Sequence, residues 1–247
     1  SLHDALPISI AQALASDKHH HAWLITGPEG IGKATFAYRV ARAALARADE
    51  RGMFGTGLDV EPGSAAYRQV TALSHPGLVV IRRAYDLKAK RVASTITVDD
   101  VRRLKGFLAL SAEEGGRRVV IVDSADEMNI NAANALLKSL EEPPPRTIFL
   151  LIASAPGRLL PTIRSRCRTL PLAPLSAADL KRAVAAALAA VGKPPIPDGD
   201  FAALQDLSGG SVRRLLALQE GGGLVLQGKI DKLIASLPAG DVKASHM

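Results

Sequence analysis

A glycine-rich segment between an apolar run and a helical pattern constrains the fold more than any other feature of this sequence. Residues 27–34 read GPEGIGKA and match the phosphate-loop pattern G-x-x-x-x-G-K-[ST] at every position except the last. An apolar run at residues 23–26 precedes the segment, and apolar residues recur at helical spacing over residues 34–48 after it. We therefore predict a strand, a phosphate-binding loop and a helix in that order, rather than an ordinary glycine turn.

Strand and helix patterns alternate through the first two thirds of the chain. Further apolar strands are predicted at residues 78–81, 119–122 and 148–153, with helices opening near residue 98 and covering residues 131–140. Alternation of this kind indicates an α/β fold with a parallel sheet whose two faces are covered. The basic segment 82–95 is predicted to be a loop or hairpin. After Pro174 only alanine- and leucine-rich helical patterns remain.

The phosphate loop contains most of the groups that hold a nucleotide, but it lacks one that holds a metal. Three glycines allow backbone N–H groups to turn toward phosphate oxygens: Gly27, Gly30 and Gly32. Lys33 is suited to bridge the outer phosphates. The hydroxyl that normally binds Mg²⁺ is missing, because the last position is Ala34. Thr35 is next in sequence, but one helical residue rotates a side chain by about 100°, so we expect weak ATP binding at most.

The apolar strand at residues 119–122 ends in Asp123. A strand of this kind delivers an acid to Mg²⁺ in nucleotide-binding proteins, although apolar strands that end in Asp are common. Asp126 and Glu127 follow closely and are candidates for a water-activating base in place of Ser124, the residue after Asp123. Their offset of two or three residues from Ser124 favours a structural role for both.

Two downstream segments carry a family resemblance. Residues 134–144 read NALLKSLEEPP and residues 160–167 read LPTIRSRC. With the phosphate loop, they resemble the AAA+ clamp-loader subunits of bacterial DNA polymerase III over about residues 21–216. The delta-prime branch of that family fits best, because the phosphate loop and the acidic pair are both degraded. Relatives often carry four cysteines as a zinc module, whereas residues 48–75 contain none, so we expect no zinc and no other metal.

The resemblance implies three domains. They are a RecA-like P-loop AAA+ domain over residues 10–174, a small helical lid over residues 175–222, and the start of a truncated helical collar over residues 223–247. The ends of the chain, residues 1–9 and the final Ser-His-Met, suggest a fragment with foreign terminal residues.

The resemblance also assigns roles to single residues. Hydrolysing AAA+ proteins usually place a water-activating glutamate after the strand acid, and Ser124 stands there instead. Arg166 would project across a subunit boundary toward ATP held by a neighbouring subunit. Ser154 would be a polar sensor of the phosphate. Arg213 would be a second sensor, and an ordinary helix start capped by Ser211 is an equally good interpretation.

Arg102 and Lys138 would face the phosphates of primer-template DNA, although solvated helix faces would look the same in sequence. The resemblance implies a non-hydrolysing stator that needs no cofactor of its own. Its partners would be the clamp-loader motor subunits, the clamp-opening subunit and the sliding clamp, within a DNA-directed DNA polymerase holoenzyme. The alternatives are a working gamma/tau-like ATPase motor and an unrelated P-loop NTPase.

Composition agrees with these expectations without selecting among them. The chain has 247 residues and a net charge of +7, which favours contact with phosphates or an acidic partner. A single cysteine, Cys167, excludes an internal disulfide or a cysteine-based zinc site. No apolar run approaches the length that spans a bilayer and no secretion signal is visible, so we expect a cytoplasmic protein with no membrane partner.

Overall fold

The computed structural model describes residue 10 and residues 20–51, 57–87, 90–109 and 116–223. The chain divides into two compact units, Ser1–Ala173 and Pro174–Met247. That division lies one residue before the predicted boundary at residues 174 and 175. The predicted start of a collar, residues 223–247, lies outside the described residues except for Gly223.

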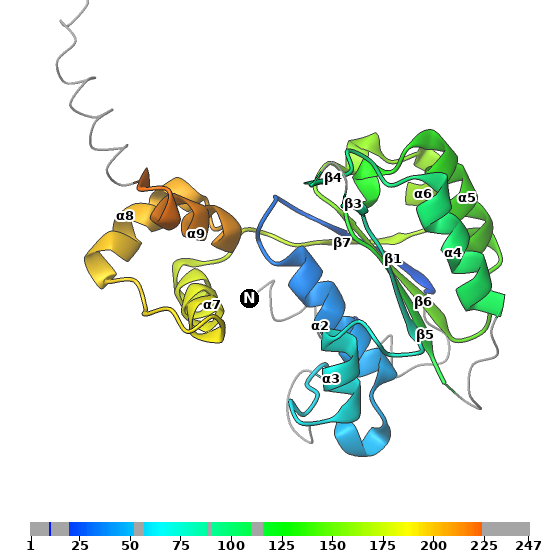
Figure 1. The fold of residues 1–247 in the computed structure, drawn as a ribbon, viewed down its shortest axis with the longest axis horizontal. Coiled ribbons are helices and arrows are strands. Elements are labelled where there is room, and N and C mark those ends of the chain that lie inside the picture. Colours follow the sequence, from blue (N-terminus) through cyan, green and yellow to red (C-terminus); the bar gives the residue numbers. More distant parts are fainter. Residues whose placement is uncertain (1–9, 11–19, 52–56, 88–89, 110–115, 224–247) are drawn as a thin grey trace, which may run out of the picture. The chain divides into compact units, whose positions relative to one another are not determined.

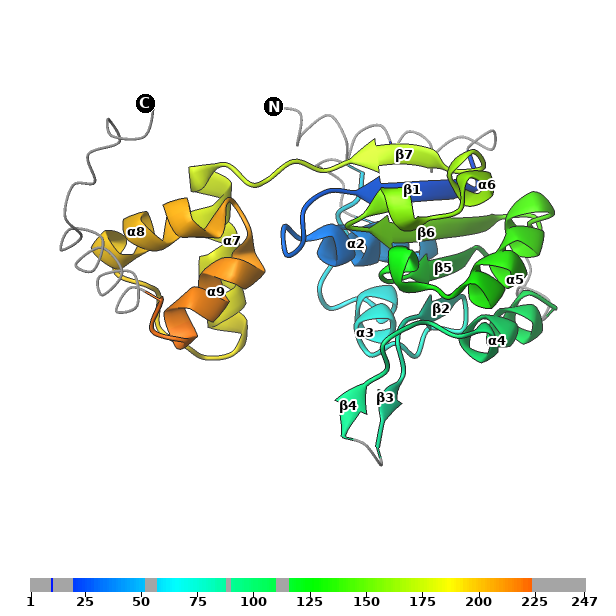
Figure 2. The same ribbon diagram turned by 90° about the horizontal axis from the view of Figure 1, so that it is seen from above.

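The larger unit is built on one five-stranded sheet (Figures 1 and 2). Its strands are β1 (Ala22–Thr26), β2 (Leu78–Ile81), β5 (Arg118–Val122), β6 (Thr147–Ala153) and β7 (Arg168–Pro171). They are ordered β2-β5-β6-β1-β7, and every neighbouring pair runs parallel. Because parallel strands need crossover connections, helices cover both faces. The predicted parallel α/β sheet is confirmed.

Side chains of the central strands alternate between two hydrophobic cores, as the two-residue period of a strand requires. In β5, Val119 and Ile121 belong to the first core, and Val120 and Val122 belong to the second. All four are completely buried. This explains why the strand is a continuous apolar run and not an alternating one.

Different helices close the two cores. The first core is covered by α2 (Lys33–Leu45), with α3 (Ala65–Thr71) packed against α2. The second core is covered by α4 (Val98–Ala109), α5 (Ile130–Glu141) and α6 (Pro161–Arg164). Figure 1 shows these two sets of helices on opposite sides of the strands. The loop after β1 therefore enters α2 on the first-core face.

Short elements complete the larger unit. They are the 3₁₀ turns η1 (Ala48–Glu50), η2 (Ala125–Glu127) and η3 (Pro156–Arg158), and the antiparallel strands β3 (Tyr85–Asp86) and β4 (Arg91–Val92). The β3–β4 hairpin confirms the loop-or-hairpin prediction for residues 82–95. Figure 2 shows the hairpin projecting away from the sheet.

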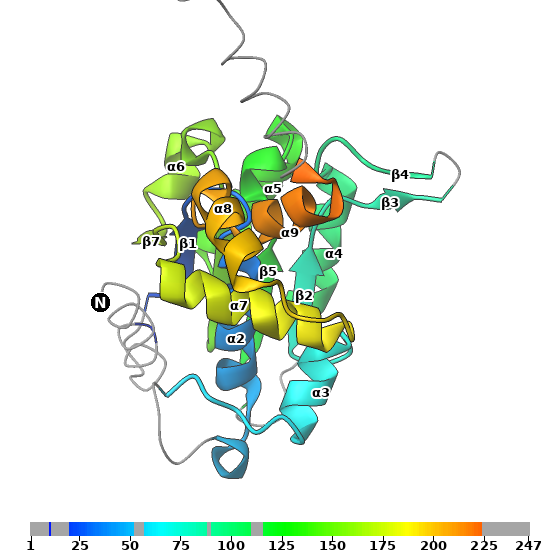
Figure 3. The ribbon, with the colours of Figure 1, turned by 90° about the vertical axis from the view of Figure 1, so that its left-hand side faces the viewer.

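The smaller unit contains α7 (Ala177–Ala190), α8 (Asp198–Ser208) and α9 (Val212–Glu220) (Figure 3). They pack around a third core that includes Leu180, Phe201 and Leu215. Gly209 ends α8 in the left-handed conformation, which glycine adopts without strain. The helical character predicted after Pro174 is confirmed for the described residues.

Two local predictions were incomplete. The first helix ends at Leu45 and not at residue 48, because buried Ala46 takes an extended conformation while its N–H still bonds Arg42 O at 2.8 Å. Strand β7 was not predicted, because its polar and proline-containing sequence lacks a strand pattern. It forms because the edge of β1 offers backbone partners to a parallel neighbour.

Candidate functional site

The phosphate loop lies at the carboxyl end of β1 and needs its glycines for distinct reasons. Gly27 has a φ of 141°, and a Cβ at this position would lie 2.3 Å from Leu172 O. Gly30 also has a positive φ, and Gly32 precedes α2 in the left-handed region with a φ of 101°. The first glycine is therefore required by close packing and the last by its backbone conformation.

Lys33 is buried at the start of α2. Its Nζ donates hydrogen bonds to Gly27 O at 2.7 Å, Pro28 O at 2.6 Å and Ser154 Oγ at 2.8 Å. Burial lowers the pKa of Lys33, and the nearby charge of Asp126 is the largest opposing influence. The lysine is thus held by its own loop and by Ser154, the residue that follows β6, which brings two predicted site residues together.

The position that normally binds metal has lost its oxygen. Ala34 is half-buried and packs against the first core, while Thr35 is exposed on the next position of α2. Asp123 follows β5, and burial raises the pKa of its carboxyl against the opposing charges of Arg82 and Lys33. Mg²⁺ coordination of the usual kind requires both the hydroxyl and the acid. The side chains at this site therefore do not fit a resident Mg²⁺ ion.

The residues after Asp123 are committed to structural contacts. Ser124 lies in the left-handed region with a φ of 63°. Asp126 Oδ2 accepts hydrogen bonds from the backbone N–H groups of Ser154, at 3.1 Å, and Ala155, at 2.7 Å. The Glu127 carboxylate pairs with Arg83 Nε at 2.8 Å. Both acids that offered an alternative water-activating group are thus used to hold neighbouring segments, as the sequence predicted.

Arg166 lies two residues after the end of α6. Its guanidinium pairs with Glu141 at 2.7 Å and donates to Thr162 O at 3.0 Å, with 36% of the side chain exposed. Arg164, two residues earlier, is exposed. Arg166 is therefore oriented by two contacts within its own unit but remains accessible to solvent.

Cys167 packs against the second core, and burial raises the pKa of its thiol to about 11. A thiol with this pKa is a poor nucleophile at neutral pH. This agrees with the structural role predicted for the cysteine.

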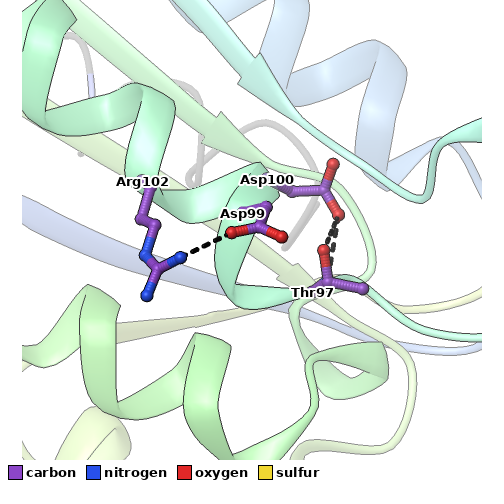
Figure 4. Close-up of polar contacts among 4 residues, drawn as sticks. All are labelled: Thr97, Asp99, Asp100 and Arg102. Atoms are coloured by element: carbon purple, nitrogen blue, oxygen red, sulfur yellow. Dashed lines mark hydrogen bonds and ion pairs between the residues drawn. The ribbon is translucent and has the colours of Figure 1, made fainter.

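The predicted DNA-contacting residues lie on two adjacent helices. Arg102 on α4 forms an ion pair with Asp99 at 2.7 Å, and 68% of its side chain is exposed (Figure 4). Lys138 is exposed on α5, which packs against α4. Both side chains are accessible to a polyanion, although Arg102 would have to exchange its partner Asp99 for a phosphate. The contact with DNA stays a prediction.

Arg213 lies in the first turn of α9 and is exposed. The N-cap of this helix is Ser211, whose Oγ accepts a hydrogen bond from Arg214 N at 3.2 Å. The capping interpretation of Ser211 is therefore confirmed. The sensor role of Arg213 stays a prediction.

Sequence reasoning did not single out Arg82 and Arg83 as members of the site. They follow β2, whose carboxyl end lies at the same edge of the sheet as Asp123. Their position directly after a predicted strand could have identified them, because residues after neighbouring parallel strands meet at one edge of the sheet. The many other basic residues in the segment 82–91 made these two arginines hard to distinguish.

The described part of the chain has neither a metal-binding cluster nor a membrane-spanning helix. Within it, no three or more His, Cys, Asp or Glu side chains are grouped so that they could hold a metal ion. His21 forms a hydrogen bond through Nε2 with Leu140 O at 2.9 Å. No helix among the same residues has the length and apolar character needed to cross a membrane.

The chain is similar to known proteins of one family. The sequence profile described as DNA polymerase III, delta subunit matches residues 3–176. The DNA polymerase III subunit delta' of Pseudomonas aeruginosa is 41% identical over 200 residues, which cover 78% of this chain and 54% of that protein. The DNA polymerase III subunit gamma/tau of Mycobacterium bovis is 32% identical over 176 residues, which cover 68% of this chain and 27% of that protein.

The chain thus spans about half the length of the delta' relative, and less of the gamma/tau relative. Among solved structures, the Thermotoga maritima RuvB Holliday junction branch migration motor aligns with a TM-score of 0.53 at 17% identity. The alignment covers 89% of this chain and 59% of RuvB. At that identity the likeness shows the fold alone, which is the predicted AAA+ fold.

Proposed function

Because the chain belongs to the DNA polymerase III delta subunit family, we propose that it is a delta-prime-type subunit of a bacterial clamp loader. In this role it is a stator that hydrolyses no ATP itself. It helps partner subunits to load a sliding clamp onto primed DNA in the cytoplasm. The identity to a relative named subunit delta' supports this assignment over a general P-loop NTPase.

One observation carries the non-hydrolysing part of the proposal. The metal-binding hydroxyl is replaced by Ala34 and the water-activating carboxylate by Ser124. The neighbouring acids do not compensate, since Asp126 holds the backbone at the end of β6 and Glu127 pairs with Arg83. A phosphate loop can hold a nucleotide weakly under these conditions but lacks the groups that activate water.

The proposal assigns a catalytic contribution in trans to Arg166. A guanidinium that reaches a neighbour's ATP offsets charge on the transferred phosphoryl group. Two features support this role, namely the accessible side chain and its anchoring by Glu141 and Thr162 O. Anchoring reduces the side-chain entropy that is lost when the arginine engages a phosphate.

The partners follow from the same proposal. The subunit would contact motor subunits that hydrolyse ATP, a clamp-opening subunit, the clamp and the phosphate backbone of primer-template DNA. Arg102 on α4 and Lys138 on α5 are the proposed backbone contacts, supported by their exposure on adjacent helices.

ATP turnover by the purified chain tests the proposal. We expect no hydrolysis above the background of a Lys33→Ala preparation, with Mg²⁺ present and ATP in excess. Steady turnover that disappears with Lys33→Ala would show that the chain is a motor.

A gamma/tau-like motor is the second candidate, and the identity to the Mycobacterium relative favours considering it. It would require Thr35 to take the place of the missing hydroxyl. Thr35→Ala separates the candidates, because only a motor would lose activity from this change.

A further inference from the structure

Arg82 and Asp123 occupy equivalent positions at the carboxyl edge of the sheet. Each is the first residue after its strand, β2 or β5, and the two strands are parallel neighbours. The register pairs Ile81 with Val122, and Asp123 N donates a hydrogen bond to Ile81 O at 2.8 Å. The backbone of Arg82 therefore starts beside that of Asp123.

The alternation of side chains directs both residues to the same face. Ile81 and Val122 both belong to the second core. The residue that follows each of them is consequently directed to the other face, where α2 and the phosphate loop lie. Tyr38 on α2 is affected by both charges on that face. Burial and the negative charge of Asp123 raise the pKa of Tyr38, and the positive charge of Arg82 opposes that rise.

The segment that carries Arg82 is also fixed in place. Its neighbour Arg83 pairs with Glu127 at 2.8 Å, and Glu127 lies in η2, directly after Asp123 and Ser124. Ile96 N adds a hydrogen bond to Glu127 O at 2.9 Å, which ties the chain after the hairpin to the same turn. These contacts hold the backbone of Arg82 close to Asp123.

The electrostatics of the cluster do not favour a divalent cation. Three positive groups, Arg82, Lys33 and Arg83, act on the Asp123 carboxyl, and the carboxylate of Asp126 opposes them. The protein itself therefore already supplies positive charge to Asp123. A metal ion brought to Asp123 would be repelled by Arg82 and Lys33, and no hydroxyl at Ala34 would help to bind it.

We propose that Arg82 is the permanent counter-cation of Asp123 and takes the electrostatic place of Mg²⁺, so that this phosphate loop holds no divalent metal. Arg82 is a positioning residue that keeps the segment after β5 folded without a metal ion at Asp123. This inference rests on the proposed non-hydrolysing function and explains how such a site stays stable after losing the metal.

Manganese titration without nucleotide tests the inference. Mn²⁺ binding to the whole chain is measured by electron paramagnetic resonance, and the melting temperature is recorded in parallel. The wild-type chain should show no Mn²⁺ binding that depends on Asp123, as judged against Asp123→Asn. Arg82→Ala should melt about 2 to 4 °C lower and gain Mn²⁺ binding that raises the melting temperature again.

Two controls distinguish loss of the positive charge beside Asp123 from loss of any positive charge on the protein. Arg82→Lys keeps the charge and should behave as wild type. Arg91→Ala removes an exposed arginine from β4 of the projecting hairpin and should change neither the melting temperature nor Mn²⁺ binding. In Arg82→Ala/Asp123→Asn, the gained Mn²⁺ binding should disappear.

The inference is overturned if the wild-type chain binds Mn²⁺ through Asp123, or if Arg82→Ala melts as wild type and gains no Mn²⁺ site. Neither result would affect the stator proposal, which is tested by ATP turnover. Conversely, ATP turnover by the chain would remove the stator proposal while the manganese measurement still decided the role of Arg82.

Discussion

Arg166 is the residue whose loss should act on a neighbouring subunit and not on this chain. In a loader reconstituted with a full-length version of the protein, Arg166→Ala should lower ATP hydrolysis at the adjoining site by about 10³ to 10⁵. Its ion pair with Glu141 is partly exposed, so the cost to stability should be within about 1 kcal/mol. Because other sites keep hydrolysing ATP, the clamp-loading rate is the better measurement.

Arg164→Ala is the matched control, since Arg164 lies two residues before Arg166, at the end of α6, and is exposed. It should load clamps at the wild-type rate. If Arg164→Ala abolishes loading while Arg166→Ala does not, the wrong arginine has been assigned. If both load normally, no trans-acting arginine lies in this segment.

The raised pKa of Cys167 predicts that its thiol reacts slowly in the folded chain. A pKa of about 11 leaves few thiolates in the folded chain at pH 8. Modification by a disulfide reagent should therefore be on the order of 100-fold slower in the folded chain than in urea. The ratio of the two rates at pH 8 is the measurement, and equal rates would contradict burial of the thiol.

The linkage of Cys167 to stability has a definite sign. The folded state disfavours the thiolate, so its pKa is higher in the folded chain than in the unfolded one. The corresponding contribution to stability is complete below the unfolded pKa and is lost as the pH rises through the folded pKa of about 11.

At the scale of elements, the start of α4 depends on Asp100. This buried carboxylate accepts hydrogen bonds from Thr97 N at 2.9 Å and Thr97 Oγ1 at 2.8 Å, as in a capping box (Figure 4). Asp100→Ala should lower the free energy of unfolding by about 0.5 to 2 kcal/mol in urea denaturation. Asp99→Ala, on the exposed face of the same turn, should change it by less than about 0.5 kcal/mol.

This cap matters for the proposed DNA contact, because Arg102 lies one turn further along α4. Loss of the cap would disturb the position of Arg102, whereas Asp99→Ala releases its guanidinium from the ion pair. An unchanged unfolding free energy for Asp100→Ala would mean that tertiary packing, and not the cap, fixes the start of α4.

At the scale of the whole molecule, the second core holds the sheet and the helices α4 and α5 together. Leu136 on α5 is completely buried there. Leu136→Ala should therefore lower the free energy of unfolding by about 2 to 5 kcal/mol. Leu87→Ala, at a position that is 82% exposed, is the control and should change it by no more than about 0.5 kcal/mol. Similar costs for the two variants would contradict the assigned core.

Local features of the protein follow from its residue types and their order along the chain. The glycines of residues 27–34 are required by backbone conformation and close packing. The phosphate loop could therefore be predicted from the sequence pattern alone. The apolar runs of β5 and β6 predicted their burial in a parallel sheet. The absence of a hydroxyl at Ala34 and of a carboxylate at Ser124 was equally plain, because it depends on residue type alone.

Which distant residues come into contact depends on the tertiary fold. Strand β7 forms because β1 has a free edge, although its own sequence has no strand pattern. The contact between Asp126 and the backbone of Ser154 and Ala155 joins segments that are 28 and 29 residues apart. Arg82 comes to lie beside Asp123 through the pairing of β2 with β5. The physical reason is that strand register and crossover connections bring distant residues to one edge of the sheet, and local residue preferences do not encode those distances.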